Sequence, residues 1–210
     1  MLAARVVEPE WLDELPAADP RAARSRRDLV RINALMGNAR IVAHALGRSG
    51  APGSIAEIGA GDGAFMRALL PRLDPAPREI HLVDKQAGPG IIAMDVFDWL
   101  AGIAHVDAIV ANLFLHHFEP PALARMLSLA ASRTRVFIAC EPRRSAFALT
   151  GASLLGLIGC NDVSRHDAVV SVRAGFAGRE ITALWPNDCG WTCEERATGL
   201  FSHLFVARAA

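Results

Sequence analysis

The strongest constraint on the fold is the glycine-rich stretch 54–70, which reads SIAEIGAGDGAFMRALL. A short apolar run leads into Gly59, Gly61 and Gly63, and residues typical of a helix follow. Glycine adopts backbone conformations that are closed to other residues, and a helix that starts at a turn directs free N–H groups into it. A strand, a glycine turn and a helix in this order predict a nucleotide-binding corner.

The spacing of the glycines bears on which nucleotide would bind. A dinucleotide fingerprint has the form G-x-G-x-x-G, whose last position here is Ala64, a residue the pattern tolerates. The turn itself is G-x-G-x-G, preceded by an acid, and it resembles the first motif of class I S-adenosylmethionine-dependent methyltransferases, E/D-x-G-x-G-x-G. The cationic sulfonium and amino-acid tail of that cofactor suit a site bearing a carboxylate. The resemblance implies a cofactor-binding turn made of Glu57, Gly59, Ala60, Gly61, Asp62 and Gly63. The alternative is a tight turn without a ligand.

Composition limits the other classes of protein. The 210 residues, 52% hydrophobic and 21% charged, suit one globular domain. A net charge of +0 argues against a nucleic-acid partner, which needs a basic surface. No apolar run reaches about 18 residues and the N-terminus has no signal-like core, so we expect no membrane segment and a cytoplasmic location. Cys189 and Cys193 have only His203 nearby in sequence, so we predict no metal site.

Two further acids follow the next predicted strands. Residues 79–83, EIHLV, form a strand that ends at Asp84, and we predict that Asp84 and the next residue, Lys85, contact the cofactor. An acid at this strand tip is placed to accept hydrogen bonds from ribose hydroxyls, although a solvated strand-end acid is the alternative. A short strand at 91–94 is followed by Asp95 and Val96. The methyltransferase resemblance implies that this pair contacts the adenine amino group and ring.

Asp98 competes with Asp95 for the adenine contact, or it caps a helix that begins near Trp99. The next strand is predicted at 106–111, whose continuous apolar run is typical of a buried parallel strand. The segment 112–118, NLFLHHF, then lies where open α/β sheets bind ligands. It resembles the fourth motif of methyltransferases of the ubiquinone/menaquinone-biosynthesis type. This resemblance implies cofactor contacts by Asn112 and Leu113 and a substrate contact by Phe114.

A fifth strand is predicted at 135–140 and is followed by an almost wholly apolar stretch at 145–159. That stretch is either a core helix or a cap helix lining an apolar pocket, because class I methyltransferases often carry a substrate-recognition insert here. We therefore expect a substrate cap at 143–177. The strings R-H-D and V-S-V-R within it, like R-R-D-L-V-R-I-N at 26–33, resemble bacterial methyltransferases found beside type III polyketide synthases.

The whole chain is predicted to be an α/β protein with a Rossmann-like, seven-stranded, mostly parallel sheet. Residues 1–49 form an N-terminal arm and helical cap, and residues 50–210 form the cofactor-binding domain with helices on both faces. The arm itself is expected to be loose at residues 1–20. The helical part has an apolar face made of Leu29, Ile32, Leu35 and Met36. The chain closes in a strand hairpin at 191–196 and 200–208, and the resemblance implies that the last strand is antiparallel at the edge of the sheet.

The predicted reaction is methyl transfer from S-adenosylmethionine to a small acceptor, with S-adenosylhomocysteine as product. Transfer to an oxygen benefits from a general base, and His166, His116 and His117 are the candidates. We favour His166, which lies in the cap beside Asp167, although adjacent residues on a helix point apart. Basic side chains that would hold a carboxylate or enolate of the substrate are Arg143, Arg165 and Arg173.

The apolar stretch points to a hydrophobic acceptor, and the resemblance to a phenolic or polyketide-like one. The rival interpretations are a non-catalytic S-adenosylmethionine-binding protein and an NAD-dependent oxidoreductase. The chain has no tyrosine, which excludes a Tyr–Lys hydride-transfer site. A nucleic-acid methyltransferase is disfavoured because no N/D-P-P-Y/F tetrapeptide follows the fourth strand. A monomer and a homodimer are both compatible with the sequence.

Overall fold

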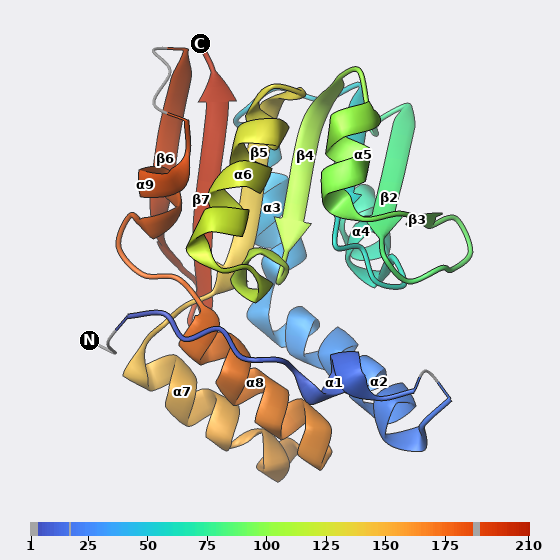
Figure 1. The fold of residues 1–210 in the computed structure, drawn as a ribbon, viewed down its shortest axis with the longest axis vertical. Coiled ribbons are helices and arrows are strands. Elements are labelled where there is room, and N and C mark those ends of the chain that lie inside the picture. The colour runs from blue at the N-terminus through green and yellow to red at the C-terminus, as the bar shows by residue number, and fades with distance from the viewer. Residues whose placement is uncertain (1–3, 17, 187–189) are drawn as a thin grey trace.

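The computed structural model describes residues 4–16, 18–186 and 190–210, and within these ranges the strands form a single sheet (Figure 1). The strand order is β3-β2-β1-β4-β5-β7-β6, so the sheet has seven strands, as predicted. Their bounds are β1 (Ser54–Ile58), β2 (Glu79–Asp84), β3 (Ile92–Ala93), β4 (Val106–Asn112), β5 (Thr134–Pro142), β6 (Trp191–Thr198) and β7 (Ser202–Ala209). β1 to β5 pair in parallel, and β7 is antiparallel to both of its neighbours. One expectation was wrong: β7 lies between β5 and β6, and β6 forms the edge.

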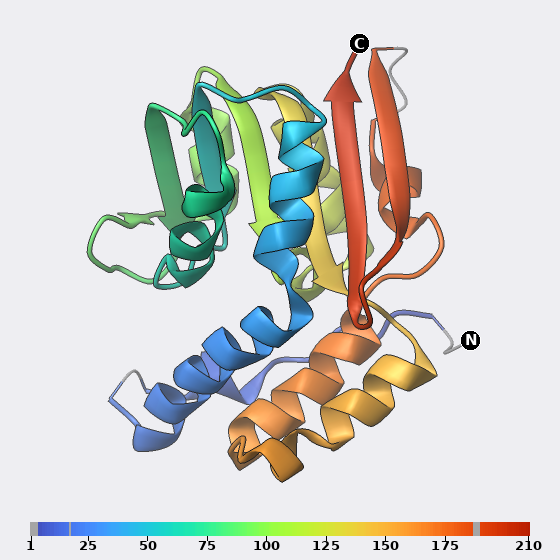
Figure 2. The same cartoon turned by 180° about the vertical axis from the view of Figure 1, so that it is seen from behind.

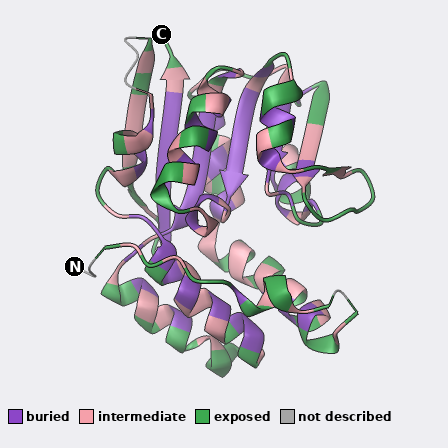
Figure 3. Ribbon diagram, in the orientation of Figure 1, coloured by how far each residue is buried: buried purple, intermediate pink, exposed green. Residues whose placement is uncertain are grey.

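Helices cover both faces of the sheet (Figures 1 and 2). One face carries α3 (Asn38–Gly47) and α4 (Ala64–Leu69), the latter continued by η1 (Leu70–Arg72). The other carries α5 (Val96–Gly102), α6 (Pro120–Ala131) and α9 (Glu180–Leu184). The central strands are therefore buried on both sides (Figure 3), which explains their continuous apolar runs.

A second layer lies beyond the carboxyl ends of the parallel strands (Figure 1). It contains α1 (Trp11–Glu14), α2 (Pro20–Met36), α7 (Ala146–Ser153) with η3 (Leu155–Ile158), and α8 (Asp162–Ala174). α2 ends at Gly37, which adopts a left-handed conformation with a φ of 70°, and α3 begins at the next residue. The arm before α1 is not loose where it is described. Arg5 donates to the carbonyl oxygens of Ala174, His116 and Phe118 at 2.7, 3.2 and 3.1 Å.

The most buried residues of α2 are Ala22, Ser25 and Asp28, which the apolar periodicity did not predict. Of the predicted apolar face, Leu35 is 71% exposed and the other three residues are only partly buried. Ser164 Oγ donates to Asp28 Oδ2 at 3.1 Å, and the N–H of Asn161, the residue that caps α8, donates to the same oxygen at 2.9 Å. Hydrogen bonds to α8 therefore help to set which side of α2 faces the molecule.

α7 is part of this second layer and not of the sheet's core. Its buried residues are Ala148 and Ala152, while Phe147 is 59% exposed and Leu157 in η3 is 82% exposed. The sequence allowed either a core helix or a cap helix here. Because α7 lies outside the core of the sheet, its position fits a cap helix better than a core helix. None of the helices in the described part of the chain is both long and apolar enough to cross a membrane.

Candidate functional site

The glycine turn joins the tips of β1 and β2. The N–H groups of Gly59 and Ala60 both donate to the carbonyl oxygen of Val83 in β2, at 2.9 and 3.0 Å. Gly59, Gly61 and Gly63 have φ values of 71°, 55° and 75°, a region that strongly favours glycine. A Cβ on Gly61 would meet no described atom within 4 Å, so this part of the turn faces open space. Asp62 is exposed, and its Oδ1 accepts the first N–H of α4 at 2.9 Å.

Two acids flank the turn. Glu57 is 1% exposed, and among the described residues its Oε2 has no hydrogen-bond partner. Burial raises the pKa of Glu57 to about 8, although a hydrogen bond from the backbone of Met66 acts in the opposite direction. On the other side, Asp84 accepts the N–H groups of Gly61 and Gln86, both at 2.8 Å. A carboxylate has about four lone-pair sites, so Asp84 keeps capacity for a ligand hydroxyl.

Phe114 packs directly on the turn. A Cβ on Gly59 would lie 2.1 Å from Phe114 Cδ2, so the ring occupies the space that a side chain would need. Phe118 meets Phe114 edge-on at 5.1 Å between ring centroids, and Phe97 meets Phe118 edge-on at 5.9 Å. Phe97, Phe114 and Phe118 therefore form a row of rings, called the aromatic wall below, that begins at the glycine turn.

Asp95 caps a helix, a role the sequence offered to Asp98. Asp95 Oδ1 accepts the N–H of Phe97 at 2.8 Å, and α5 begins at Val96, so Asp98 lies in its first turn. Asp95 Oδ2 also pairs with Lys85 Nζ at 3.0 Å, which brings two predicted cofactor residues together. Val96 is buried beneath them.

Asn112 and Leu113 end β4 in a constrained conformation. Asn112 is buried, and its side-chain oxygen accepts Nδ2 of Asn38 at 2.8 Å. Ser202 Oγ in turn donates to Asn38 Oδ1 at 2.7 Å, which connects β4, α3 and β7. Leu113 has φ 52°, a left-handed conformation that is costly for a residue with a branched side chain. Such strain concentrates at functional sites, and here it directs the following residues back over the sheet.

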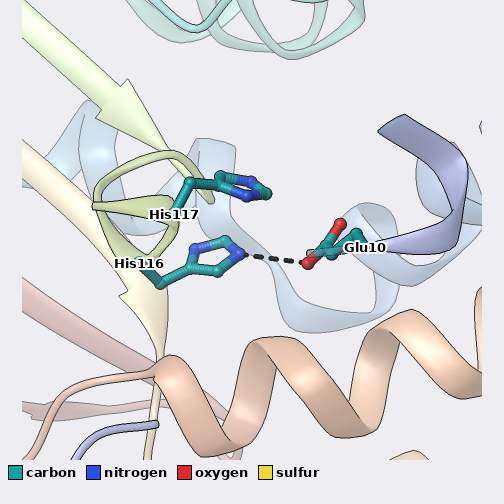
Figure 4. A group of neighbouring side chains, drawn as sticks. All are labelled: Glu10, His116 and His117. Carbon is teal, nitrogen blue, oxygen red and sulfur yellow. Dashed lines mark hydrogen bonds and ion pairs between the residues drawn. The ribbon is translucent and has the colours of Figure 1, made fainter. Parts of the chain in front are cut away.

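His116 lies between the carboxylates of Glu10, which Figure 4 shows, and Glu141. Its Nδ1 is 2.9 Å from Glu141 Oε2, and its Nε2 is 3.4 Å from Glu10 Oε1. Burial by itself lowers the pKa of His116, but hydrogen bonds and charge from Glu10 and Glu141 outweigh it and raise the pKa to about 9. Glu141 also accepts the backbone N–H groups of residues 114–116, at 3.0, 3.0 and 3.4 Å. A buried acid at the end of β5 therefore fixes the segment η2 (Leu115–His117).

His117 is a different kind of imidazole. Its ring lies 4.2 Å from that of His116, and its side chain is 30% exposed. Burial and the charge on His116 together lower the pKa of His117 to about 4. His117 Nδ1 is 3.9 Å from Asp13 Oδ2, and burial together with the charges of Glu10 and Asp167 raises the pKa of Asp13 to about 6.

His166 contacts the arm. Its ring stacks on Trp11 at 3.8 Å and 7°, and its Nδ1 lies 3.0 Å from Asp167 Oδ1. The expectation that these adjacent residues point apart was therefore wrong. Asp167 also accepts the N–H groups of Trp11 and Leu12 at 2.9 and 3.0 Å, and so caps α1 from outside the helix.

The three predicted substrate arginines do not form one cluster. Arg165 and Arg173 are exposed on α8, eight positions or about 12 Å apart along its axis. Arg143 is half-buried at the end of β5, where its N–H donates to Phe201 O at 2.7 Å. Arg5, which the sequence did not suggest, lies closer to the histidine pair and packs 4.2 Å over the ring of Phe176.

Sequence reasoning missed most partners of the histidines. Glu10 lies 106 positions before His116, and Glu141 lies 25 positions after it. The one signal that was present is the position of Glu141 directly after a buried parallel strand, where ligands gather in α/β sheets. Nothing in the sequence near Glu10 distinguishes it from the other acids of the arm. Cys189, considered as a metal ligand, lies outside the described residues, and Cys193 is a free thiol.

No protein-family model and no curated protein sequence matches the chain. Solved structures do. A plantazolicin methyltransferase in complex with SAH aligns with a TM-score of 0.68 and 11% identity, over 94% of this chain and 92% of that one. An O-methyltransferase family protein from Burkholderia thailandensis aligns at 0.63 and 16% identity, over 92% of this chain and 61% of the other. Magnesium protoporphyrin IX methyltransferase from Synechocystis PCC 6803 with bound SAH aligns at 0.54 and 14% identity, over 95% and 91%.

These alignments show that the chain has the fold of class I S-adenosylmethionine-dependent methyltransferases, as the glycine motif predicted. The chain spans about three fifths of the length of the O-methyltransferases it matches. Because one fold hosts many functions, the activity has to be argued from the residues of the site.

Proposed function

We propose that this protein transfers a methyl group from S-adenosylmethionine to a small acceptor. The observation that carries the proposal is the glycine turn: Gly61 borders open space and donates to Asp84, and among the described residues Oε2 of the buried Glu57 has no hydrogen-bond partner. A buried carboxyl oxygen without a partner is unfavourable unless a donor or cation meets it. The cofactor supplies such groups, since it carries an ammonium and a sulfonium.

The residues of the turn have separate tasks in this proposal. Asp84 accepts the ribose hydroxyls through its remaining lone pairs, while Asp95 and Val96 hold the adenine end. The turn backbone and Glu57 hold the amino-acid tail. Bound S-adenosylmethionine supplies an activated methyl group with a good leaving group, so the protein's main task is to align the acceptor.

We place the acceptor between the aromatic wall and the second layer. Phe114 is common to both regions, because it contacts Gly59 and begins the segment that carries the histidine pair. Flat rings edge-on to one another favour an apolar or phenolic acceptor, with oxygen as the methylated atom. The arm and helices of residues 1–49 and the insert 143–177 act as the cap. His166, whose ring is stacked on Trp11, is a poorer candidate for a general base than the sequence suggested.

Isothermal titration calorimetry tests the cofactor assignment. We expect micromolar binding of S-adenosylmethionine and S-adenosylhomocysteine, no binding of NAD, and at least about tenfold weaker binding by Asp84→Ala. Glu79→Ala is the matched control, since Glu79 is an exposed acid at the other end of the same strand. Binding of NAD in place of the adenosyl ligands would support an oxidoreductase, and no binding by folded protein would refute the proposal.

Methylation of a panel of phenols and polyketide lactones, followed by mass spectrometry, then tests the transferase activity. Cofactor binding without any methylated product, across acceptors with oxygen, nitrogen and carbon nucleophiles, would favour the non-catalytic binding protein.

A further inference from the structure

A group of three potential metal ligands lies where the arm meets the carboxyl edge of the sheet (Figure 4). Glu10, His116 and His117 each offer one ligand atom, and these atoms all lie within 4.8 Å of one another. They come from two segments that are far apart in sequence, the arm and η2. The sequence suggested no metal site, because no spacing of neighbouring residues connects Glu10 with the histidine pair.

The geometry of the pair Glu10–His116 suits a shared ion better than a strong hydrogen bond. The separation of 3.4 Å between Glu10 Oε1 and His116 Nε2 exceeds the usual 2.7–3.2 Å range for N–H···O hydrogen bonds. Two ligands on a tetrahedral zinc ion, each at about 2.0–2.1 Å, lie about 3.4 Å apart. The two side chains would therefore need little movement to bind one ion.

The surroundings of these ligands are also those of a metal site. Histidines that bind metals usually direct the other ring nitrogen to a carboxylate, which fixes the ring and its tautomer. His116 has that arrangement, because its Nδ1 meets Glu141 Oε2 at 2.9 Å. Glu10 is held in place by Ser171 Oγ, which donates to Glu10 Oε1. Both groups are thus oriented by neighbours that belong to other elements.

We propose that Glu10, His116 and His117 bind one divalent transition-metal ion, with zinc as the best fit. Two imidazoles and one carboxylate give three protein ligands, which is the pattern of a catalytic zinc site with a fourth position open. If the proposed methyl transfer is correct, the ion would bind the oxygen of a hydroxyl acceptor and lower its pKa, so that the hydroxyl loses its proton to solvent water and the oxygen becomes the nucleophile. That last step rests on the proposed function, whereas the metal site itself does not.

The test is a metal titration without cofactor or acceptor. Protein stripped with a chelator is titrated with Zn²⁺ by calorimetry and with Co²⁺ by visible absorption, and the bound metal is counted by mass spectrometry. We expect one equivalent per chain, and binding weaker by at least about tenfold in Glu10→Gln and in His117→Asn. The matched controls are Glu8→Gln in the same arm and His44→Asn on α3, both exposed, and these should bind as the unaltered protein does.

Circular dichroism establishes that each variant is folded, and either ligand variant alone decides the outcome if the other does not fold. The proposal is refuted if the unaltered protein fails to bind one equivalent of metal. It is also refuted if Glu10→Gln binds the metal as tightly as the unaltered protein does. Calorimetry with S-adenosylhomocysteine on the same samples separates the two proposals. If the ligand variants lose the metal but still bind S-adenosylhomocysteine, the metal site and the methyltransferase proposal are both supported. If the unaltered protein binds the metal but not S-adenosylhomocysteine, only the methyltransferase proposal is refuted.

Discussion

At the scale of the residue, Glu57 is a buried carboxyl whose pKa depends on its environment. Its carboxyl is buried beneath the glycine turn and burial raises its pKa to about 8. A carboxyl with a raised pKa binds its proton more tightly in the folded state, so this group stabilises the protein fully below its ordinary pKa of about 4.5. That contribution is lost as the pH rises toward 8, with a limiting slope of about 1.4 kcal/mol per pH unit.

Glu57→Gln is therefore expected to remove this pH dependence. Urea denaturation at pH 5 and pH 8 should show a smaller loss of unfolding free energy in the variant than in the unaltered protein. The same substitution should weaken binding of S-adenosylmethionine, because an amide, unlike the carboxyl, cannot ionise to meet the cationic groups of the cofactor. Glu79→Gln serves as the control on an exposed acid. An identical pH dependence in Glu57→Gln would show that this carboxyl is already ionised in the fold.

Gly59 is constrained both by its backbone and by its neighbour. Its φ is 71°, and any Cβ would lie 2.1 Å from Phe114. We expect Gly59→Ala to lower the unfolding free energy by about 2–4 kcal/mol, from overpacking and backbone strain together. Gly61→Ala shares the positive φ but has no neighbour within 4 Å, so it should cost only about 1–2 kcal/mol.

A double-mutant cycle separates the two causes at Gly59. If the clash dominates, Phe114→Ala should recover part of the loss in Gly59→Ala, as read from urea denaturation. Equal costs for Gly59→Ala and Gly61→Ala would instead mean that Phe114 moves away freely and that only the backbone matters.

At the scale of the element, α1 is a helix of one turn that depends on another helix for its capping. Asp167 on α8 accepts the N–H groups of Trp11 and Leu12, and His166 stacks on the Trp11 ring. A helix of this length has no stability of its own. Its position over the histidine pair therefore depends on these contacts.

Asp167→Ala is expected to release α1 from α8. Loss of a cap costs about 1 kcal/mol, so hydrogen exchange of the amides in residues 10–15 should become about fivefold faster. Asp162→Ala, at the exposed first turn of the same helix, is the matched control. If exchange in the arm is unchanged in Asp167→Ala, other contacts such as those of Arg5 hold α1 in place.

The elements differ in how well the sequence could predict them. β4 and β5 were predicted closely, because a strand buried on both faces must be apolar at nearly every position. The orientation of α2 was not predicted, because Ser25 and Asp28 on its buried face form hydrogen bonds with α8, more than 130 positions later in the sequence. Local periodicity carries no information about such distant polar partners.

At the scale of the whole molecule, the same distinction separates the glycine turn from the histidine cluster. The glycine turn and Asp84 occupy successive strand ends, so the order of the chain alone brings them together. The cluster of Glu10, His116 and Glu141 requires the arm to fold back across the sheet, which depends on contacts such as those of Arg5. The sequence therefore predicted that the turn and Asp84 lie together, but it suggested only His116 of this cluster.

The two layers of the molecule should also differ in stability. The sheet is packed on both faces against large clusters of buried apolar residues, whereas α7 joins a small cluster in which Ala148, Ala152 and Val172 are buried. Amides protected by few buried apolar contacts exchange through local opening, at less than the free energy of global unfolding. We expect native-state hydrogen exchange of α7 to respond little to low denaturant, while β4 and β5 exchange only by global unfolding.

This difference in stability has a consequence for ligand entry. If the second layer is the cap over the acceptor, binding of S-adenosylhomocysteine alone should slow exchange around the glycine turn and leave α7 nearly unchanged. Adding an acceptor should then slow exchange in α1, α7 and α8, because the cap closes only over a filled site. The measurement is exchange followed by mass spectrometry on the same protein in three states. If α7 exchanges as slowly as β5 in the free protein, the cap is a rigid part of the core, and acceptors must enter by another route.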